Sequence, residues 1–334
     1  MGRRLTDQQR ARIASIQAGR RQRMGSRAER ELAALADAPP RPGRVIVRHG
    51  QHLLVEDESG TPHQCLFRQN LGDVVCGDRV AWQATGDRTG VVTARLERTA
   101  ALARPDYSGR DKPLAANLTQ LVVVIAPRPE PNEYLVDQYL AAAELIGVGA
   151  LLAINKIDLV DGAADEALRA RFAHYARIGY PLVAVSARRT RGLEPLSALL
   201  RDQVSVLVGQ SGVGKSSLVN ALLPDREAQT GRLSESTGHG RHTTSAATLY
   251  HLPGGGDLID SPGVRSFRLG RLDRRALETG FREVRAHLGH CQFRDCTHDH
   301  EPGCAVKAAV AAGEVDPRRL TNFLHLAAGL PPPF

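Results

Sequence analysis

The sequence predicts a multidomain protein with a small all-β barrel, a larger α/β domain and a small helical domain at its carboxyl end. Short strand-like runs bounded by turn residues fill about residues 44–98, apolar runs alternate with helical patterns from about 114 to 269, and a helical, basic tail with clustered Cys and His follows. The spacing of the apolar residues changes between these segments from the period of strands to that of helices, which indicates that each segment has a different fold. The 334 residues give room for two or three domains with cores of their own.

Composition narrows the class of protein. The net charge is +8, with arginine far commoner than lysine, which favours a polyanionic partner such as nucleic acid. The apolar runs are shorter than the ~20 residues that cross a bilayer, and the arginine-rich amino terminus has no apolar signal core. We therefore expect a cytoplasmic protein with no membrane segment. Five cysteines, three of them near His298, favour a reducing compartment and a metal site over disulfides, whereas Cys65 and Cys76 are expected to be buried core residues.

Residues 1–43 are predicted to form a basic extension and a linker. Nine arginines precede position 31, with apolar residues at loosely helical spacing. The stretch "APPRPG", Ala38–Gly43, is expected to be a linker because prolines lack the amide donor that a helix needs. The arginines form either a solvated tail or a surface for RNA, and the second interpretation is favoured if the other domains also suit nucleic acid.

Residues 44–100 are predicted to form an oligonucleotide-binding (OB) barrel. The runs "RVIVR", "HLLVE", "HQCLF", "DRVAWQA" and "GVVTARL" alternate with Gly, Asp and Asn turns. Five short strands in about 55 residues fit this fold, which often presents one face to RNA. The alternative is a barrel that only spaces the other domains.

Residues 101–270 are predicted to form an α/β P-loop domain. The strand-like runs "TQLVVVIA", "ALLAIN", "PLVAVSA" and "VSVLVG" alternate with helical patterns. Such alternation predicts a mostly parallel sheet with helices on both faces, and nucleotides bind at the carboxyl ends of its strands. The expected helices are Tyr134–Ile146, Ala164–Arg177 and Leu193–Leu200.

The segment "GQSGVGKS" matches the G-x-x-x-x-G-K-[ST] phosphate loop, between a strand and a helix-compatible run. Its backbone amides would surround phosphate oxygens, Lys215 would reach the β and γ phosphates, and Ser216 would offer its hydroxyl to Mg²⁺. The predicted phosphate contacts are Gly209, Gln210, Ser211, Gly212, Val213, Gly214, Lys215, Ser216 and Ser217.

Two further motifs follow strands and complete a guanine nucleotide pocket. In "NKID", Asn155 and Asp158 would read guanine, because a carboxylate accepts from N1 and the exocyclic amine, while Lys156 covers the base. Ser186 and Ala187 would supply an amide to the base oxygen. In "DSPG", Asp260 would hold Mg²⁺ through water and Gly263 would face the γ phosphate.

The order of these motifs is unusual for a guanine-nucleotide switch, because the base reader precedes the phosphate loop by about fifty residues. A circular permutation explains it, since such a cut leaves a sheet intact when the original ends lie close together at the surface. The segment after "DSPG" then runs directly into the Cys/His tail. We therefore expect the nucleotide state to act on that tail.

The chain resembles the ribosome small-subunit-dependent GTPase A family from about Arg44 onward. The resemblance is carried by "CGDRVAW", "KPLAANLTQLVVVIA", "NKIDL", "VSVLVGQSGVGKSSLVNALL", "GRHTTSAATLY", "DSPGVRSF" and "CQFRDCTHDHEPGCAV". It implies a permuted GTPase that acts late in maturation of the small ribosomal subunit and its rRNA, binds GTP with Mg²⁺ and is stimulated by that subunit. The tail, residues 271–334, would be a helical zinc domain.

The zinc ligands implied by the resemblance are Cys291, Cys296, His298 and Cys304. Three thiolates and one imidazole form a closed tetrahedral set, which is typical of structural zinc. Metal binding in such small domains contributes on the order of 10 kcal/mol to folding. His290 and His300 are alternative ligands, although a residue adjacent to another ligand chelates poorly.

The segment Gly238–Thr248 matches the family's first switch, where Thr243 or Thr244 would cover Mg²⁺. Val264 stands where many GTPases carry a water-orienting glutamine, so intrinsic hydrolysis should be slow, and a partner that supplies a missing group can add ~10³ to 10⁵ in rate. His239 and His242 are candidates for positioning water. The predicted catalytic residues are Lys215, Ser216, Thr243, Thr244, Gly263 and His242.

The sequence thus predicts a monomeric GTPase of small-subunit maturation. One alternative is an RNA-binding scaffold in which GTP is only a structural ligand, and the missing glutamine leaves this alternative open. Another is a permuted GTPase that serves the large subunit, against which the barrel and the zinc motif argue.

Overall fold

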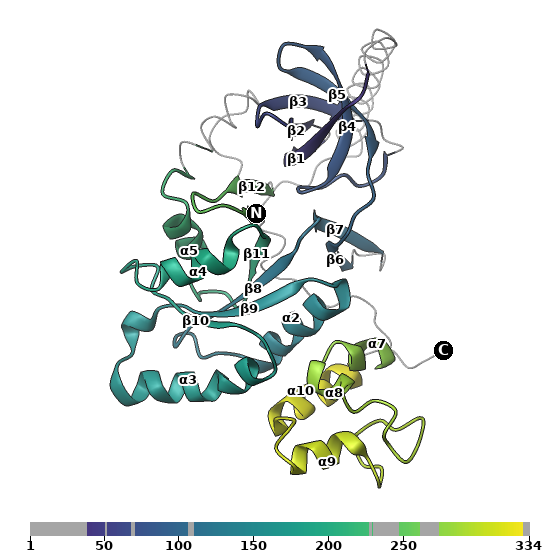
Figure 1. The fold of residues 1–334 in the computed structure, drawn as a ribbon, viewed down its shortest axis with the longest axis vertical. Coiled ribbons are helices and arrows are strands. Elements are labelled where there is room, and N and C mark those ends of the chain that lie inside the picture. Colours follow the sequence, from purple (N-terminus) through teal and green to yellow (C-terminus); the bar gives the residue numbers. More distant parts are fainter. Residues whose placement is uncertain are drawn as a thin grey trace, which may run out of the picture.

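The computed structural model describes residues 39–50, 52–67, 71–105, 110–226, 229, 247–260 and 274–329. Figure 1 shows three parts: a strand barrel, an α/β part next to it, and a group of helices near the carboxyl end. The predicted helical stretch in residues 1–38 lies outside the described residues. Among the helices that can be described, none is both long and apolar enough to span a membrane.

Five strands close into the predicted barrel. Strand β1 pairs with both β2 and β4, and β3 runs parallel to β5, which gives the closed order β1-β2-β3-β5-β4. Trp82 fills the centre with no exposed surface, surrounded by valines and leucines that alternate along the strands. The strands are β1 Arg41–His49, β2 His52–Glu56, β3 Pro62–Phe67, β4 Arg79–Gly86 and β5 Thr89–Arg95.

The linker prediction is wrong at its carboxyl end. Strand β1 begins at Arg41, inside the predicted linker, because residues 41–44 pair with β4. Pro42 lies opposite Ala81, and its carbonyl accepts a hydrogen bond from Trp82 Nε1 at 3.2 Å. The expectation for the two barrel cysteines is confirmed: Cys65 and Cys76 are buried, and burial raises the pKa of each thiol to about 12.

A two-stranded sheet that the sequence did not predict follows the barrel. It consists of β6 Ala101–Pro105 paired antiparallel with β7 Asp111–Ala116. Asn117 ends the hairpin in a left-handed conformation. Its side chain accepts from the amide of Thr99 at 3.0 Å and donates to the carbonyl of Gly77 at 2.9 Å. The hairpin is thereby fixed to the barrel before the main sheet begins.

The α/β part has the predicted architecture. Its strand order is β10-β9-β8-β11-β13-β12, and all strands run parallel except β12. The strands are β8 Gln120–Ile125, β9 Gly149–Ile154, β10 Leu182–Ala184, β11 Val204–Val208, β12 Thr248–His251 and β13 Asp257–Asp260. The helices are α2 Glu133–Ile146, α3 Gly162–Arg177, α4 Leu193–Leu200 and α5 Lys215–Leu222, with a short 3-10 helix, η2, at Ile157–Leu159.

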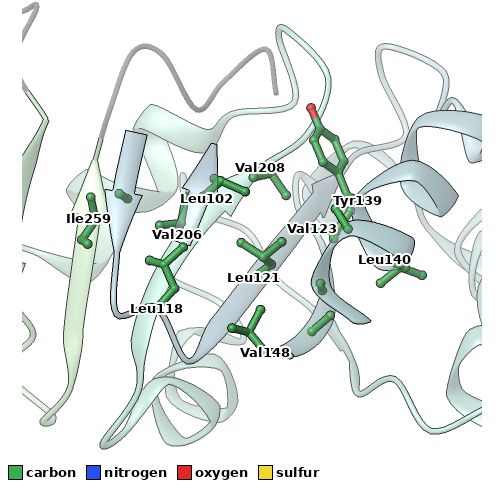
Figure 2. Packing of buried hydrophobic residues seen from close by; sticks show 14 of the residues in the cluster. Leu102, Leu118, Leu121, Val123, Tyr139, Leu140, Val148, Val206, Val208 and Ile259 are labelled. Atoms are coloured by element: carbon green, nitrogen blue, oxygen red, sulfur yellow. The ribbon is translucent and has the colours of Figure 1, made fainter. Parts of the chain in front are cut away.

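Alternate residues of the central strands bury opposite faces of this sheet. Leu121 and Val123 of β8 point into a core shared with α2 and α3, which Figure 2 shows from close by. Val122 and Val124 point into the other core, with α4 and α5. Both faces are therefore covered, as the apolar runs predicted, and the strand ends between these layers are available to hold a site.

The barrel joins the α/β sheet at the β12 edge. Strand β1 pairs antiparallel with β12 at Val47 and Thr248, which makes one sheet of eleven strands. Beside it, Asp257 accepts from Arg44 at 2.5 Å and from His251 Nδ1 at 2.6 Å, and His251 Nε2 lies 2.8 Å from Glu56. Ion pairs and hydrogen bonds thus connect strands β1 and β2 of the barrel to the β12–β13 hairpin.

The tail packs on helix α2 as a group of short helices. A separate core contains Phe281 and Phe323, which meet edge to face with ring centroids 5.4 Å apart, and includes Ala141 of α2. The helices are α7 Arg274–Thr279, α8 Arg282–Arg285, α9 Ala305–Ala311 and α10 Pro317–Ala328. The apolar contact through Ala141 connects this tail to the α/β part.

Candidate nucleotide site and metal centre

The predicted phosphate loop lies between β11 and α5, at the carboxyl edge of the sheet. Two of its glycines are required by the backbone: a Cβ on Gly209 would lie 2.2 Å from the carbonyl oxygen of Val124, and one on Gly214 would lie 2.5 Å from Asn155 Nδ2. Lys215 begins α5 and is buried, and its Nζ donates to the carbonyls of Gly209 at 2.7 Å and Gln210 at 2.8 Å. The ammonium therefore lies against the loop.

Asn155 joins the base-reading motif to this loop. Its side chain is buried, and Nδ2 donates to the carbonyls of Val213 at 3.0 Å and Gly214 at 3.4 Å. Its Oδ1 accepts from the amide of Ala187 at 3.2 Å. One amide side chain thus bridges three loops that are far apart in the sequence, and the predicted motifs meet at one place despite their order.

Lys156 and Asp158 flank this bridge. Lys156 adopts a left-handed conformation, and its Nζ donates to the carbonyls of Gly212 at 2.6 Å and Arg128 at 3.0 Å. Asp158, in the 3-10 helix η2 that follows β9, accepts from the Ser186 hydroxyl at 2.5 Å. This hydrogen bond lowers the pKa of the Asp158 carboxyl. An ionised carboxylate, oriented by Ser186, therefore lies two residues after Lys156, whose ammonium contacts the phosphate loop.

Asp260 ends β13, which runs parallel to β11. Its carboxylate pairs with Arg226 at 2.7 Å, and the Arg226 guanidinium also lies over the ring of Tyr250, 5.3 Å from its centroid. Ser216 and Ser217 are exposed in the first turn of α5. The other predicted residues, His239, His242, Thr243, Thr244, Gly263 and Val264, lie outside the described residues.

The four predicted metal ligands form a compact cluster in the tail. The ligand atoms of Cys291, Cys296, His298 and Cys304 all lie within 4.8 Å of one another. His298 Nδ1 is 3.6 Å from Cys291 Sγ and 3.4 Å from Cys304 Sγ, and these sulfurs are 4.0 Å apart. Backbone amides of His298 and Ala305 donate to sulfurs at 3.4 Å. The cluster could hold a metal ion.

The two alternative histidines are not members of this group, the only one that the described part of the chain offers for a metal. His300 is mostly exposed and lies 3.9 Å from Asp299. Sequence reasoning missed a neighbour of the cluster: Glu278 of α7 lies 3.6 Å from His298 Nε2. A carboxylate at the second ring nitrogen orients a ligating imidazole. An isolated Glu in a helix gives no signal of this role.

Sequence reasoning also missed the loop at 126–132. Its contribution to Lys156 is the carbonyl of Arg128, and a carbonyl contact depends on the path of the backbone and leaves no residue signature. Pro129 lies in the same loop, 3.6 Å from where a Cβ on Gly212 would stand. The loop therefore borders the site directly.

Comparison with known proteins agrees with this geometry. The family model described as RsgA GTPase matches residues 95–270. A relative from Azotobacter vinelandii, named Small ribosomal subunit biogenesis GTPase RsgA, is 49% identical over 338 residues and covers 99% of this chain and 98% of its own. The chain belongs to the RsgA GTPase family. The predicted permuted GTPase is thus confirmed at the level of the family.

Further RsgA proteins and solved structures extend the match. A protein of the same name from Pseudomonas aeruginosa is 48% identical, with 98% of each chain covered. The crystal structure of YjeQ from Thermotoga maritima superposes with a TM-score of 0.72 at 32% identity, over 88% of this chain and all of that one. YloQ, described as a circularly permuted GTPase, gives 0.71 at 29% identity, over 89% and 98%. The predicted fold class is confirmed.

Proposed function

We propose that this protein is a GTPase of small-ribosomal-subunit biogenesis, which hydrolyses GTP to GDP and phosphate and is stimulated by that subunit. Membership of the RsgA GTPase family supports the activity. The observation that carries the proposal for this chain is the Asn155 side chain, which bonds to the phosphate loop and to the Ala187 amide at once. A pocket for base and phosphates together is what a GTPase needs.

The base is read by the loops at the ends of β9 and β10. Asp158, whose carboxylate is oriented by Ser186, accepts from guanine N1 and the exocyclic amine, which adenine does not present in that arrangement. Asn155 holds the pocket closed on the phosphate loop, Lys156 covers the base with its alkyl stem, and the Ala187 amide serves the base oxygen. GTP is therefore preferred to ATP.

The phosphates are bound by the loop from Gly209 to Ser217, with Lys215 moving from the loop carbonyls to the β and γ phosphates. Mg²⁺ would be held by Ser216, by Asp260 through water, and by Thr243 or Thr244. The position of Asp260 supports this role, because it ends β13, which runs parallel to the strand that leads into the phosphate loop. When bound, Mg²⁺ neutralises phosphate charge.

Hydrolysis is proposed to depend on the ribosomal partner. Gly263 contributes an amide toward the γ phosphate, and His242 or His239 positions the attacking water, since Val264 cannot. The absent glutamine predicts slow turnover alone and a large rise when a partner completes the site.

The metal in the tail is proposed to be one structural zinc ion. A tetrahedron with Zn–S near 2.3 Å and Zn–N near 2.0 Å has ligand atoms about 3.5 to 3.8 Å apart. The distances among Cys291, His298 and Cys304, at 3.4, 3.6 and 4.0 Å, are close to this range, and all four ligand atoms lie within 4.8 Å of one another. Three cysteines and one histidine leave no open position for water, which suits folding and not catalysis. Zinc would hold the segment between α8 and α9.

The partner is proposed to be the small subunit and its rRNA, with GTP and GDP as ligands and no membrane involved. The OB-like barrel, the tail and the basic amino-terminal segment supply the contacts, and the excess of arginine suits a phosphate backbone. Because bacterial ribosomes assemble in the cytoplasm, we place the protein there, and we propose that it acts as a monomer.

Single-turnover hydrolysis of GTP, measured with and without purified small subunits, tests this function. We expect strong acceleration by small subunits and none by large subunits. The missing glutamine favours a second candidate, an RNA-binding scaffold with GTP as a structural ligand. That candidate requires equal rates with and without subunits, and such a result would replace our proposal.

A further inference from the structure

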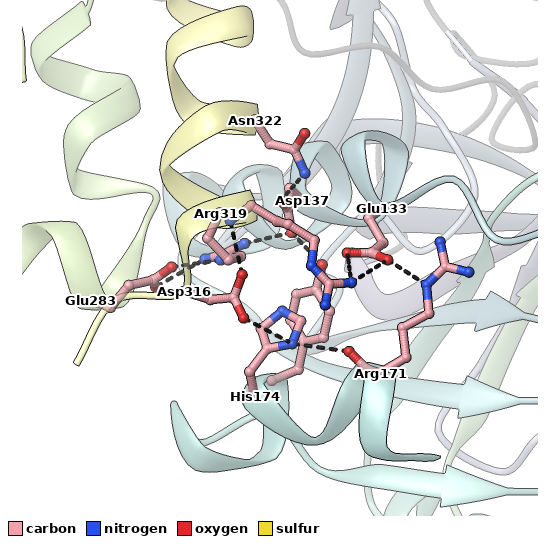
Figure 3. Close-up of polar contacts among 10 residues, drawn as sticks. Glu133, Asp137, Arg171, His174, Glu283, Asp316, Arg319 and Asn322 are labelled. Carbon is pink, nitrogen blue, oxygen red and sulfur yellow. Dashed lines mark hydrogen bonds and ion pairs between the residues drawn. The ribbon is translucent and has the colours of Figure 1, made fainter. Parts of the chain in front are cut away.

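The tail presents a charged face to helix α2. Glu133 and Asp137 lie one turn apart on α2, and Asp137 faces Arg319 of α10, as Figure 3 shows. Arg318, the residue before Arg319, pairs with Glu133. Asp137 is fully buried and accepts from Arg319 Nη1 at 2.8 Å. Arg319, only 1% exposed, also forms a two-point pair with Glu283 of α8, at 2.5 and 2.9 Å. Desolvated charges therefore attach α10 to α2.

Glu133 stands where the tail meets two parts of the nucleotide-binding domain. Its side chain is 10% exposed and accepts from Arg318 Nη1 of α10 at 3.1 Å and from Arg171 Nε of α3 at 2.5 Å. Arg171 also donates to Glu130 at 3.3 Å and to the carbonyl of Pro131 at 3.4 Å. Arg171, which is itself paired with Glu133, thus fixes the loop at 126–132 from one side.

The other side of this loop borders the nucleotide site. The carbonyl of Arg128 accepts from Lys156 Nζ, which at the same time donates to Gly212 of the phosphate loop. The loop ends at Asn132, whose side chain caps α2 by accepting from the amide of Leu135 at 3.1 Å. The loop is therefore held between Arg171, which Glu133 orients, and Lys156, so its position depends on both sides.

We propose that Glu133 is a positioning residue that couples docking of the tail to release of guanine nucleotide. Glu133 accepts from both Arg318 and Arg171. Arg171 in turn binds the loop at Glu130 and at the Pro131 carbonyl, and the loop holds Lys156 through the Arg128 carbonyl. The coupling rests on the nucleotide binding proposed above. The coupling of the two binding free energies is reciprocal by linkage: bound nucleotide strengthens docking of α10, and a partner that pulls α10 from α2 weakens nucleotide binding. We propose that this weakening is expressed as faster nucleotide release.

The first test is the dissociation rate of a fluorescent GDP analogue from the full-length protein. Arg318→Ala should release it about two to five times faster, because its partly exposed ion pair is of modest strength. Arg171→Ala, which loses three contacts to Glu133, Glu130 and Pro131, should release it about ten times faster. Arg169→Ala is the matched control on the same helix, since its ion pair goes to Asp165, and should leave the rate unchanged.

A second readout separates coupling from a loss of fold. Arg318 is largely exposed, so its alanine variant should retain its metal. In the wild type, GDP should slow amide hydrogen exchange in α10, and Arg318→Ala should abolish this effect of GDP. The coupling is overturned if Arg318→Ala and Arg171→Ala release GDP at the rate of the Arg169→Ala control, or if GDP does not change hydrogen exchange in α10 of the wild type. Either result leaves the GTPase proposal intact. A wild type that binds no guanine nucleotide overturns both.

Discussion

Replacing Arg319 with leucine should release the tail from α2. Its guanidinium makes three charge-assisted hydrogen bonds, one to Asp137 and two to Glu283, in a site where it is 1% exposed. Leucine would leave two carboxylates buried without their cation, and breaking a buried pair in this way costs about 3–5 kcal/mol. Because whole domains are stable by only about 5–15 kcal/mol, docking of the tail should become marginal.

Hydrogen exchange in α9 and α10 measures this directly, since it reports local opening without assuming two-state unfolding. A loss of about 3–5 kcal/mol speeds exchange roughly a hundredfold to several thousandfold. Arg318→Ala is the matched control. The Arg318 side chain is 57% exposed in its ion pair with Glu133, so this pair should contribute at most about 1 kcal/mol to docking.

A second substitution tests the reason for the effect. If the cost comes from unpaired buried charge, adding Glu283→Gln to Arg319→Leu should recover part of the loss, because both members of one pair are then neutral. The reasoning fails if Arg319→Leu exchanges no faster than Arg318→Ala, or if the added Glu283→Gln makes exchange faster still.

Lys215→Ala should abolish GTP binding without changing metal content, and Asp158→Asn should shift preference from GTP toward xanthosine triphosphate; equilibrium binding with unchanged affinities would remove these residues from the pocket. Cys304→Ser should cost the zinc ion, seen by metal analysis, and speed exchange in α9, while Cys65→Ser in the barrel keeps the metal. Hydrogen bonds to Asp257 and Glu56 raise the pKa of His251 to about 10, so the imidazolium stabilises the fold below about pH 6.5 and this contribution is lost as pH rises toward 10. Because His251 is half exposed, this contribution should not exceed about 1 kcal/mol. Between pH 6.5 and 9, the midpoint of thermal unfolding should change less with pH in His251→Gln than in the wild type. An equal change with pH in both proteins would contradict a stabilising role for the contacts of His251 with Asp257 and Glu56.

Local patterns predicted most elements of the fold. Helix α4 has the predicted bounds, Leu193–Leu200, and each of the five barrel strands overlaps one of the five predicted runs, because burial on a fixed period leaves its mark within each segment. The β6–β7 hairpin was missed because "ALARP" and "DKPLAA" contain few β-branched or aromatic residues. Its strands are specified by the neighbours they pack on.

Long-range polar contacts were beyond the sequence for a different reason. Arg319 lies 182 residues from Asp137 and 36 from Glu283, and nothing in a charged residue on an amphipathic helix distinguishes a buried partner from a solvated one. The Asn155 bridge was predictable in outline only because motifs of known chemistry sit at strand ends. Pairing of β1 with β12 had no such marker.

The order of the motifs along the chain has little effect on how the nucleotide pocket forms, but it decides which parts of the protein are connected to that pocket. Strands β9 and β11 both flank β8, so their carboxyl ends and the loops of Asn155 and Lys215 meet whichever is made first. The sequence suggested that nucleotide state acts on the tail through the segment after "DSPG". The structure adds a second connection, because α10 is fixed to α2 by Asp137 and Glu133. The barrel is instead paired to strand β12, so the two accessory parts attach to different elements of the α/β part, and within the described residues only the tail is connected to the loop that borders the site.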